Sequence, residues 1–176
     1  MKITTIYSII FFLVVLLSTP SCTIEITENQ EVKKYYENGQ IESKGTLFRG
    51  KKNGEAKLYY SNGQLKQVGN WVDDKQEGLW LFYDEEGNIT TKVNFKNDQQ
   101  NGLSEFFYKN GQIEEETTMI NGLPNGVVKK YHPNGKLKEE SNWHNGKREG
   151  ITVIHDSLEN IIQKVVFKDG IMISSQ

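Results

Sequence analysis

The sequence has little of several features that common functions require. Cys22 is the only cysteine among 176 residues, so no disulfide can form within the chain. Neither sign of charge dominates: the formal net charge is -2, whereas proteins that bind nucleic acid normally carry a basic face. The three histidines, His132, His144 and His155, have no metal-ligand spacing with each other or with Cys22. We therefore expect no nucleic-acid partner, no metal and no other cofactor.

Arrangements that carry out catalysis are also missing. A serine nucleophile needs a strained elbow and a histidine partner, and the sequence has neither. Adjacent acids such as Glu139 and Glu140 point to opposite faces if they lie in a strand. Asp73, Asp74 and Asp98 lie in loops and could bind a cation weakly, but they lack the spacing of a calcium loop. We expect a protein that is not an enzyme and has no small-molecule substrate.

The first 21 residues differ in kind from the rest. A short positive end is followed by an unbroken apolar run at residues 9–17 and then by small residues up to Cys22. A helix needs roughly 20 apolar residues to span a bilayer, so this run is too short and is typical of an export signal. Residues 1–21 are predicted to be a signal peptide. The alternatives are a plain secretory signal with an incidental cysteine, or an N-terminal anchor that is not cleaved.

The same segment resembles a bacterial lipoprotein signal, in which the cysteine after the cleavage point is acylated. The resemblance implies lipid attachment at Cys22 and an exported protein anchored to a bacterial membrane in the cell envelope. It leaves open which membrane holds the anchor. Residues 22–30 are predicted to be a tether, and the eight residues that follow Cys22 reach at most about 28 Å when extended. The domain at residues 31–176 would then lie close to the membrane.

One phrase of 24 residues recurs six times without an insertion or deletion. A fixed period with fixed glycines indicates one supersecondary unit that stacks on copies of itself. Repeats of this kind usually bind other molecules. The columns that carry the period are Gly39, Gly63, Gly87, Gly111 and Gly135; Gly54, Gly78, Gly102, Gly126 and Gly150; Ile41, Leu65, Ile89, Ile113, Leu137 and Ile161; and Tyr35, Tyr59, Tyr83, Phe107, Tyr131 and His155.

Each repeat alternates two turn signals with two short β-like segments. The first signal is an Asn-Gly pair such as Asn38-Gly39, which suits a two-residue or a three-residue hairpin loop. Only the three-residue loop, with its glycine in the left-handed region, pairs the Tyr35 column with the Ile41 column. The second signal has two glycines four residues apart, such as Gly50 and Gly54, and is predicted to be a tight reversal. The expected fold is all-β: an elongated, twisted antiparallel sheet, a meander of about twelve strands in stacked hairpins.

The alternation of side chains predicts one buried and one largely wet face. The apolar parity holds the positions equivalent to 41, 47, 55 and 59, and the polar parity holds those equivalent to 42, 44 and 46. Repeat three departs from this pattern, because Trp80 and Phe82 fall on the polar parity beside Leu79 and Leu81. We interpret Leu79, Trp80 and Phe82 as a candidate contact patch. The alternative is local packing over the twist of the sheet.

The recurring Tyr-x-Asn-Gly-x-(Ile/Leu), followed by an aromatic residue and Gly-x-x-x-Gly, resembles the MORN-repeat variant (membrane occupation and recognition nexus). The resemblance covers about residues 33–170. Copies three and six depart from the Asn-Gly turn, at Glu86-Gly87 and Glu159-Asn160. This motif occurs in bacterial proteins labelled YwqK-family antitoxins. The resemblance implies a twisted sheet of stacked hairpins and brings no catalytic residues with it.

Three functions are consistent with the sequence. The leading hypothesis is a membrane-anchored repeat lipoprotein that serves as a scaffold for an unknown protein partner. The first alternative, from the label of the family, is an antitoxin or immunity protein that neutralises a toxin by direct binding. The second alternative is a phospholipid-binding module that uses the aromatic face.

Overall fold

The computed structural model describes residues 29–176, which form a single antiparallel sheet with sixteen strands. The predicted signal peptide and Cys22 lie outside the described residues, and β1 begins at Asn29, inside the segment predicted as a tether. The strands are β1 (Asn29–Tyr35), β2 (Ile41–Phe48), β3 (Lys51–Lys52), β4 (Gly54–Tyr59), β5 (Leu65–Val72), β6 (Lys75–Tyr83), β7 (Ile89–Lys96), β8 (Gln99–Phe107), β9 (Ile113–Ile120), β10 (Leu123–Pro124), β11 (Gly126–Tyr131), β12 (Leu137–His144), β13 (Lys147–Arg148), β14 (Gly150–His155), β15 (Ile161–Lys168) and β16 (Ile171–Ser175).

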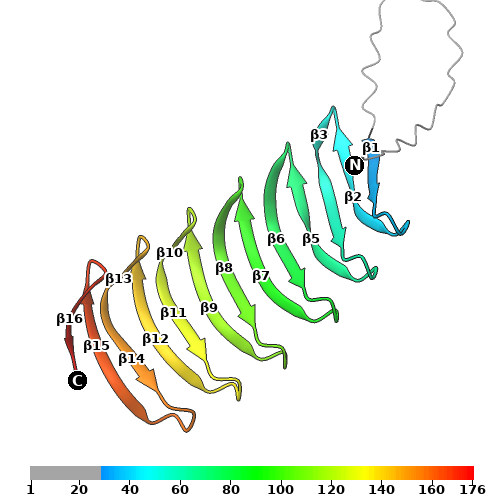
Figure 1. The fold of residues 1–176 in the computed structure, drawn as a ribbon. Coiled ribbons are helices and arrows are strands. Elements are labelled where there is room, and N and C mark those ends of the chain that lie inside the picture. The colour runs from blue at the N-terminus through cyan, green and yellow to red at the C-terminus, as the bar shows by residue number, and fades with distance from the viewer. Residues whose placement is uncertain (1–28) are drawn as a thin grey trace, which may run out of the picture.

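The strands follow one another across the sheet in chain order (Figure 1). The short strands β3, β10 and β13 lie off this path and pair with β2, β9 and β12. Figure 1 shows bowed strands in a row, with β1 at one end and β16 at the other. The predicted all-β meander of stacked hairpins is therefore confirmed. None of residues 29–176 forms a helix long and apolar enough to cross a membrane.

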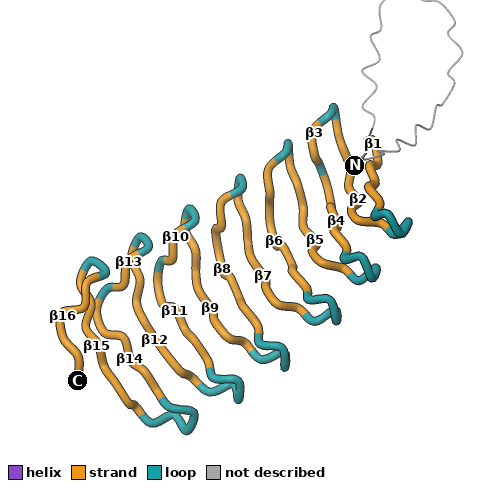
Figure 2. Tube along the Cα trace, in the orientation of Figure 1, coloured by secondary structure: helices purple, strands orange, loops and turns teal. Residues whose placement is uncertain are grey.

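Two kinds of turn alternate at the two ends of the strands (Figure 2). We call the Asn-Gly type the long turns; they occupy residues 36–40, 60–64, 84–88, 108–112, 132–136 and 156–160. In the first, the Gly39 amide donates to the Tyr36 carbonyl at 3.0 Å, and Gly39 has a φ of 84°. Tyr35 pairs with Ile41. The prediction of a three-residue loop with a left-handed glycine is thus confirmed.

The other reversals, which we call the short turns, differ from the prediction. Phe48 pairs with Lys51, so only Arg49 and Gly50 form the loop, and both have a positive φ. This is the signature of a type I′ turn. Gly54, the second glycine of the pair, lies outside the loop at the start of β4, with a φ of 88°. The pair of glycines therefore marks two features, a turn and a disturbance in the strand that follows it.

That disturbance is a β-bulge that recurs between neighbouring hairpins. Val68 pairs with Leu81, but Asn70 pairs with Glu77, so two steps along β5 match four steps along β6. A second register shift occurs beside each long turn, as between Leu58 and Tyr59. Bulges change which face the following side chains point to. The simple odd-and-even count used to predict the two faces therefore fails at two places in each repeat.

The face assignment is consequently corrected. The column of residue 47 lies on the face that is packed, since Trp71 and Trp80 make an edge-to-face contact at 5.4 Å between ring centroids. The columns of residues 55 and 59 lie on the opposite face. There the Tyr131 hydroxyl donates to the Glu116 carboxylate at 2.9 Å, and Leu79 is exposed.

The core runs as a stripe along the middle of one face, which we call the packed face. Its members form cross-strand pairs and are small except for Trp80: Ala56 with Gly69, Trp80 with Val93, Ser104 with Thr117, Val128 with Ser141, and Thr152 with Val165. Ser141 and Thr152 are 0% and 1% exposed although residues 29–176 provide no second layer. We attribute this burial to the bowing of the strands, which brings the flanking side chains over the stripe.

Candidate binding surface

Trp80 belongs to this core and not to an exposed contact patch. It is 1% exposed and is the largest fully buried side chain in the described part of the chain. Its ring lies between Trp71 and Phe95, at centroid distances of 5.4 and 6.1 Å. Phe82 shares the packed face with Trp80 and is partly buried. The local packing considered as the alternative therefore accounts for both aromatic residues.

Trp80 has room for its indole because of one glycine. A Cβ atom added to Gly69 would lie 2.1 Å from Cδ2 of Trp80, far inside contact distance. The backbone of β5 at Gly69 thus forms the seat of the indole ring. The Trp80 Nε1 atom has no hydrogen-bond partner among the described residues.

Leu79, the third residue of the predicted patch, points to the opposite face, which we call the outer face. It is 49% exposed there, and the equivalent residues of the next three repeats are equally exposed. We name these four the outer row: Leu79, Leu103, Val127 and Ile151, at 49, 47, 45 and 53% exposure. Consecutive members are two strands apart, or roughly 10 Å at the usual strand spacing. Single exposed apolar side chains are ordinary, but an aligned series over four hairpins indicates a contact surface.

Uncharged polar residues alternate with the outer row across the sheet. Leu79 pairs with Asn94, Leu103 with Thr118, and Val127 with Asn142. The Asn94 side-chain amide donates to the Leu103 carbonyl at 2.8 Å and is thereby held in place. The core of a protein interface is typically poor in charged residues. The line through the outer row has this composition from β6 to β14.

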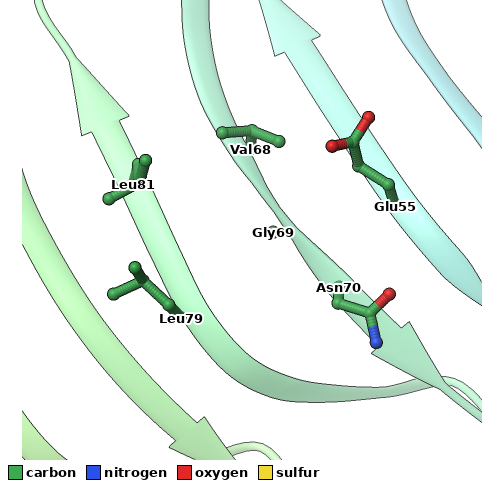
Figure 3. Close-up of a pocket in the computed structure, with 6 residues that line it drawn as sticks. All are labelled: Glu55, Val68, Gly69, Asn70, Leu79 and Leu81. Atoms are coloured by element: carbon green, nitrogen blue, oxygen red, sulfur yellow. The ribbon is translucent and has the colours of Figure 1, made fainter.

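A shallow pocket of ≈ 300 Å³ opens on the outer face beside Leu79. Figure 3 shows its lining residues, which come from β4, β5 and β6: Glu55, Val68, Gly69, Asn70, Leu79 and Leu81. The wall is mostly aliphatic, and Glu55 at its rim pairs with Lys57 at 2.6 Å. The pocket lies where β6 bulges away from β5. It is wide enough to accept one apolar side chain of a partner.

The polar residues considered for chemistry have structural roles. The Asp74 and Asp98 carboxylates accept hydrogen bonds from the Lys52 and Gln76 amides, both at 2.7 Å. His132 Nε2 lies 3.0 Å from the His155 carbonyl oxygen. Within residues 29–176, no group of three or more histidines, cysteines or acids is placed to hold a metal ion.

One group on the outer face has a strongly shifted pKa. Burial, reinforced by the neighbouring Glu116 carboxylate, raises the pKa of Tyr131 to about 12. The phenol donates its proton to Glu116 at 2.9 Å, which a phenolate could not do. Burial of the phenol and its structural hydrogen bond to Glu116 therefore account for the raised pKa, which needs no catalytic explanation.

The 24-residue period, the hairpin type and the open sheet agree with the result of a comparison against known families. The model of the MORN repeat variant matches residues 31–47, 52–73, 76–97, 100–121 and 124–145. The chain belongs to the MORN repeat variant family. MORN repeats are generally non-catalytic modules that bind proteins or membranes. Among curated proteins, none matches the chain.

Sequence reasoning found one residue of the outer row and missed three. Leu103, Val127 and Ile151 stand 24, 48 and 72 residues after Leu79, so their period was visible in the MORN repeats. They were assigned to the buried face because the parity count ran through the bulges. The signal that could have corrected this is the glycine just before each of them, such as Gly102, whose φ of 109° marks the bulge.

Proposed function

We propose that this protein is a non-catalytic repeat module that binds a partner protein through the outer row while lipid at Cys22 holds it to a bacterial membrane. The observation that carries the proposal is the exposure of four aligned aliphatic side chains on a line without charges. Nothing in the described residues covers them. The pocket beside Leu79 offers an anchor site at one end of the row.

The energetics of the outer row suit a specific but modest contact. Burying a whole leucine-sized side chain stabilises a complex by about 1.5–3 kcal/mol. The exposed halves of four such side chains then contribute roughly 3–6 kcal/mol before the costs of association. The pocket and the surrounding amides supply the remaining contacts. A membrane tether that restricts the protein to the same surface as its partner raises the effective concentration further.

A paired comparison of variants tests the binding surface. In the row variant, Leu103, Val127 and Ile151 are all replaced by threonine, which keeps strand propensity and removes apolar surface. The control variant carries Val72→Thr and Ile120→Thr, at residues that are 43 and 46% exposed but lie off the row. Affinity capture from native membranes should recover a protein with the wild type and the control and lose it with the row variant. Equal recovery with all three would refute the assignment of the surface.

The membrane anchor has a separate test. Radiolabelled palmitate should be incorporated by the wild-type protein and lost in Cys22→Ser. Labelling that survives the substitution would refute lipidation at this residue. Residues 31–176 alone, which lack both Cys22 and the apolar run at residues 9–17, mixed with vesicles of anionic or neutral phospholipid, distinguish protein binding from lipid binding. Flotation with the vesicles would favour the phospholipid-binding alternative.

A further inference from the structure

Hydrogen bonds between successive long turns join the hairpins at one edge of the array. Three tyrosine hydroxyls each donate to a backbone carbonyl of the next hairpin: Tyr36 to Tyr59 at 2.6 Å, Tyr60 to Tyr83 at 2.7 Å, and Tyr108 to Tyr131 at 2.7 Å. His132 takes the same position at the fifth turn, with Nε2 3.0 Å from the His155 carbonyl oxygen. One side chain of each of these turns thus reaches the next hairpin.

A second series of bonds runs parallel to the first. Its donors are the asparagine side-chain amides of the long turns, and each acceptor is a carbonyl of the next turn. The bonds are Asn38 to Ser61 at 2.9 Å, Asn62 to Glu85 at 3.1 Å, Asn110 to Pro133 at 2.7 Å and Asn134 to Ser157 at 3.0 Å. Four of the five junctions between successive long turns therefore have two such bonds.

These bonds matter because backbone pairing between hairpins stops short of the long turns. The last paired residues on that side are equivalent at each junction: Ser43 with Leu58, Gln67 with Phe82, Thr91 with Phe106, Glu115 with Lys130, and Glu139 with Ile154. Beyond these pairs, the side-chain bonds join one long turn to the next, and at the β7–β8 junction Lys92 also lies over the ring of Phe107 at 4.8 Å.

The third long turn has neither bond. Asp84 stands where the first, second, fourth and fifth long turns have tyrosine or histidine, and Glu86 stands where those four have asparagine. The Asp84 carboxylate turns back to its own loop, where it accepts from the Glu86 amide at 3.0 Å and the Asn88 amide at 2.8 Å. The third turn itself is linked to the fourth by an ion pair between Lys109 and Glu86 at 2.9 Å, whose side chains are 77 and 60% exposed. Farther along the same two strands, Lys92 of β7 forms an ion pair with Glu105 of β8 at 3.5 Å.

The sixth long turn is built in the same way as the third. Asp156 accepts from the Leu158 and Asn160 amides, both at 2.9 Å. Asp84 and Asp156 are 72 residues apart, as are Asn88 and Asn160. The sixth long turn is also the last one within residues 29–176, so it has no following turn there to bond to.

Other features share the longer period of 72 residues. Trp71 and Trp143 are separated by it, and so are Phe95 and Phe167. A hydrogen bond repeats with it as well: Glu77 accepts from the Asn97 amide at 3.0 Å, and Glu149 accepts from the Asp169 amide at 2.9 Å. The six hairpins thus divide into two groups of three.

We infer that the array consists of two three-hairpin blocks, β1–β7 and β8–β16, which separate at the long-turn end of the β7–β8 junction more readily than any other neighbours do. The short turn at Asn97 and Asp98 joins the blocks at the opposite end of these strands and acts as the pivot. The ion pair between Lys109 and Glu86 is an exposed latch, which salt weakens by screening. This inference does not depend on which partner the protein binds.

The outer row crosses this junction, with Leu79 in the first block and Leu103 in the second. Opening of the junction therefore changes the distance between the pocket and the rest of the row. A partner that contacts both blocks favours the closed arrangement by its difference in affinity for the two states.

Hydrogen exchange of the full-length protein tests the inference. The informative peptides cover residues 89–93 and 104–108, and the equivalent peptides at the neighbouring junctions cover 65–69 with 80–84 and 113–117 with 128–132. Two missing hydrogen bonds correspond to a difference of about tenfold or more in the opening equilibrium. The β7–β8 amides should exchange at least that much faster, and faster still when salt is raised. Equal rates at all three junctions would refute the inference.

Two variants and a matched control make the test sharper. Asp84→Tyr with Glu86→Asn restores the missing residue types and should slow exchange at the β7–β8 junction to the rate of its neighbours. Glu86→Asn alone leaves the Asp84 bonds in place and should give part of that effect. The matched control, Tyr60→Phe with Asn62→Ala, should create a fast junction between β5 and β6. If restoration leaves the β7–β8 rate unchanged, the missing bonds are not the cause and the inference fails.

Discussion

Gly69→Ala is the most severe test of how the packed face is built. The new Cβ would lie 2.1 Å from Cδ2 of Trp80, so the indole has to leave its seat. Trp80 then loses its edge-to-face contacts with Trp71 and Phe95, each worth about 0.5–1.5 kcal/mol, together with part of its burial. We expect a loss of about 2–4 kcal/mol in the free energy of unfolding, between ordinary overpacking and the complete removal of a buried tryptophan.

The assay is urea denaturation followed by circular dichroism, with tryptophan fluorescence as a second probe. Gly45→Ala is the matched control, because its added Cβ would lie 3.4 Å from Cβ of Ala56, which a small shift relieves. A double variant, Gly69→Thr with Trp80→Val, reproduces the residues that stand 48 positions later, Thr117 and Val128. Its cost should be well below the sum of the two single costs, since the residues are in contact. Equal stability of Gly69→Ala and Gly45→Ala would refute the claim that Gly69 makes room for the indole ring of Trp80.

Three further predictions concern hydrogen bonds. Tyr60→Phe removes the hydroxyl that donates at 2.7 Å to the next hairpin and should lower the free energy of unfolding by about 1 kcal/mol in chemical denaturation. Tyr131 should titrate near its raised pKa of about 12 when phenolate absorbance is followed, and Glu116→Gln should lower that pKa. Because an unfolded tyrosine has a pKa of about 10, the stability that neutral Tyr131 contributes is complete below pH 10 and is lost as the pH rises to 12. The hydrogen bonds from Asn88 hold the pKa of Asp84 below its usual range, so Asn88→Ala should raise the pKa of Asp84 when it is measured by NMR titration. The stability that ionised Asp84 contributes should disappear as the pH falls below about 4.

The sequence predicts most of this fold because the period leaves few choices. The Tyr35 and Ile41 columns determine the three-residue loop, and the left-handed Gly39 agrees with it. The faces could not be assigned by parity, because each repeat contains bulges that use extra residues without changing its length. Gly54 shows the difficulty: a glycine four residues after another suits a turn and a bulge equally well, and only the register distinguishes them.

The sequence predicted only Leu79 of the outer row, and the reason for selecting it was incomplete. Leu79 was selected because it stands beside two aromatic residues in an apolar stretch, yet Trp80 and Phe82 point to the other face. The burial of Trp80 depends on Gly69, which lies on a neighbouring strand eleven positions earlier. Nothing in the local sequence of β6 gives this contact. In the sequence, the boundary between the two blocks was visible only as two long turns that depart from the Asn-Gly pattern. Their significance becomes clear only when the hydrogen bonds made by the regular long turns are known.

The central claim is that the outer row is the surface that binds the partner, and site-specific photo-crosslinking in living cells tests it most directly. A photoreactive amino acid is placed at Leu103 or Val127 on the outer row, and at Phe106 or Thr91 on the packed face for comparison. We predict an adduct of one defined mass from the two outer-row positions and none from the packed face. Adducts from Phe106 or Thr91, with none from Leu103 and Val127, would contradict the account.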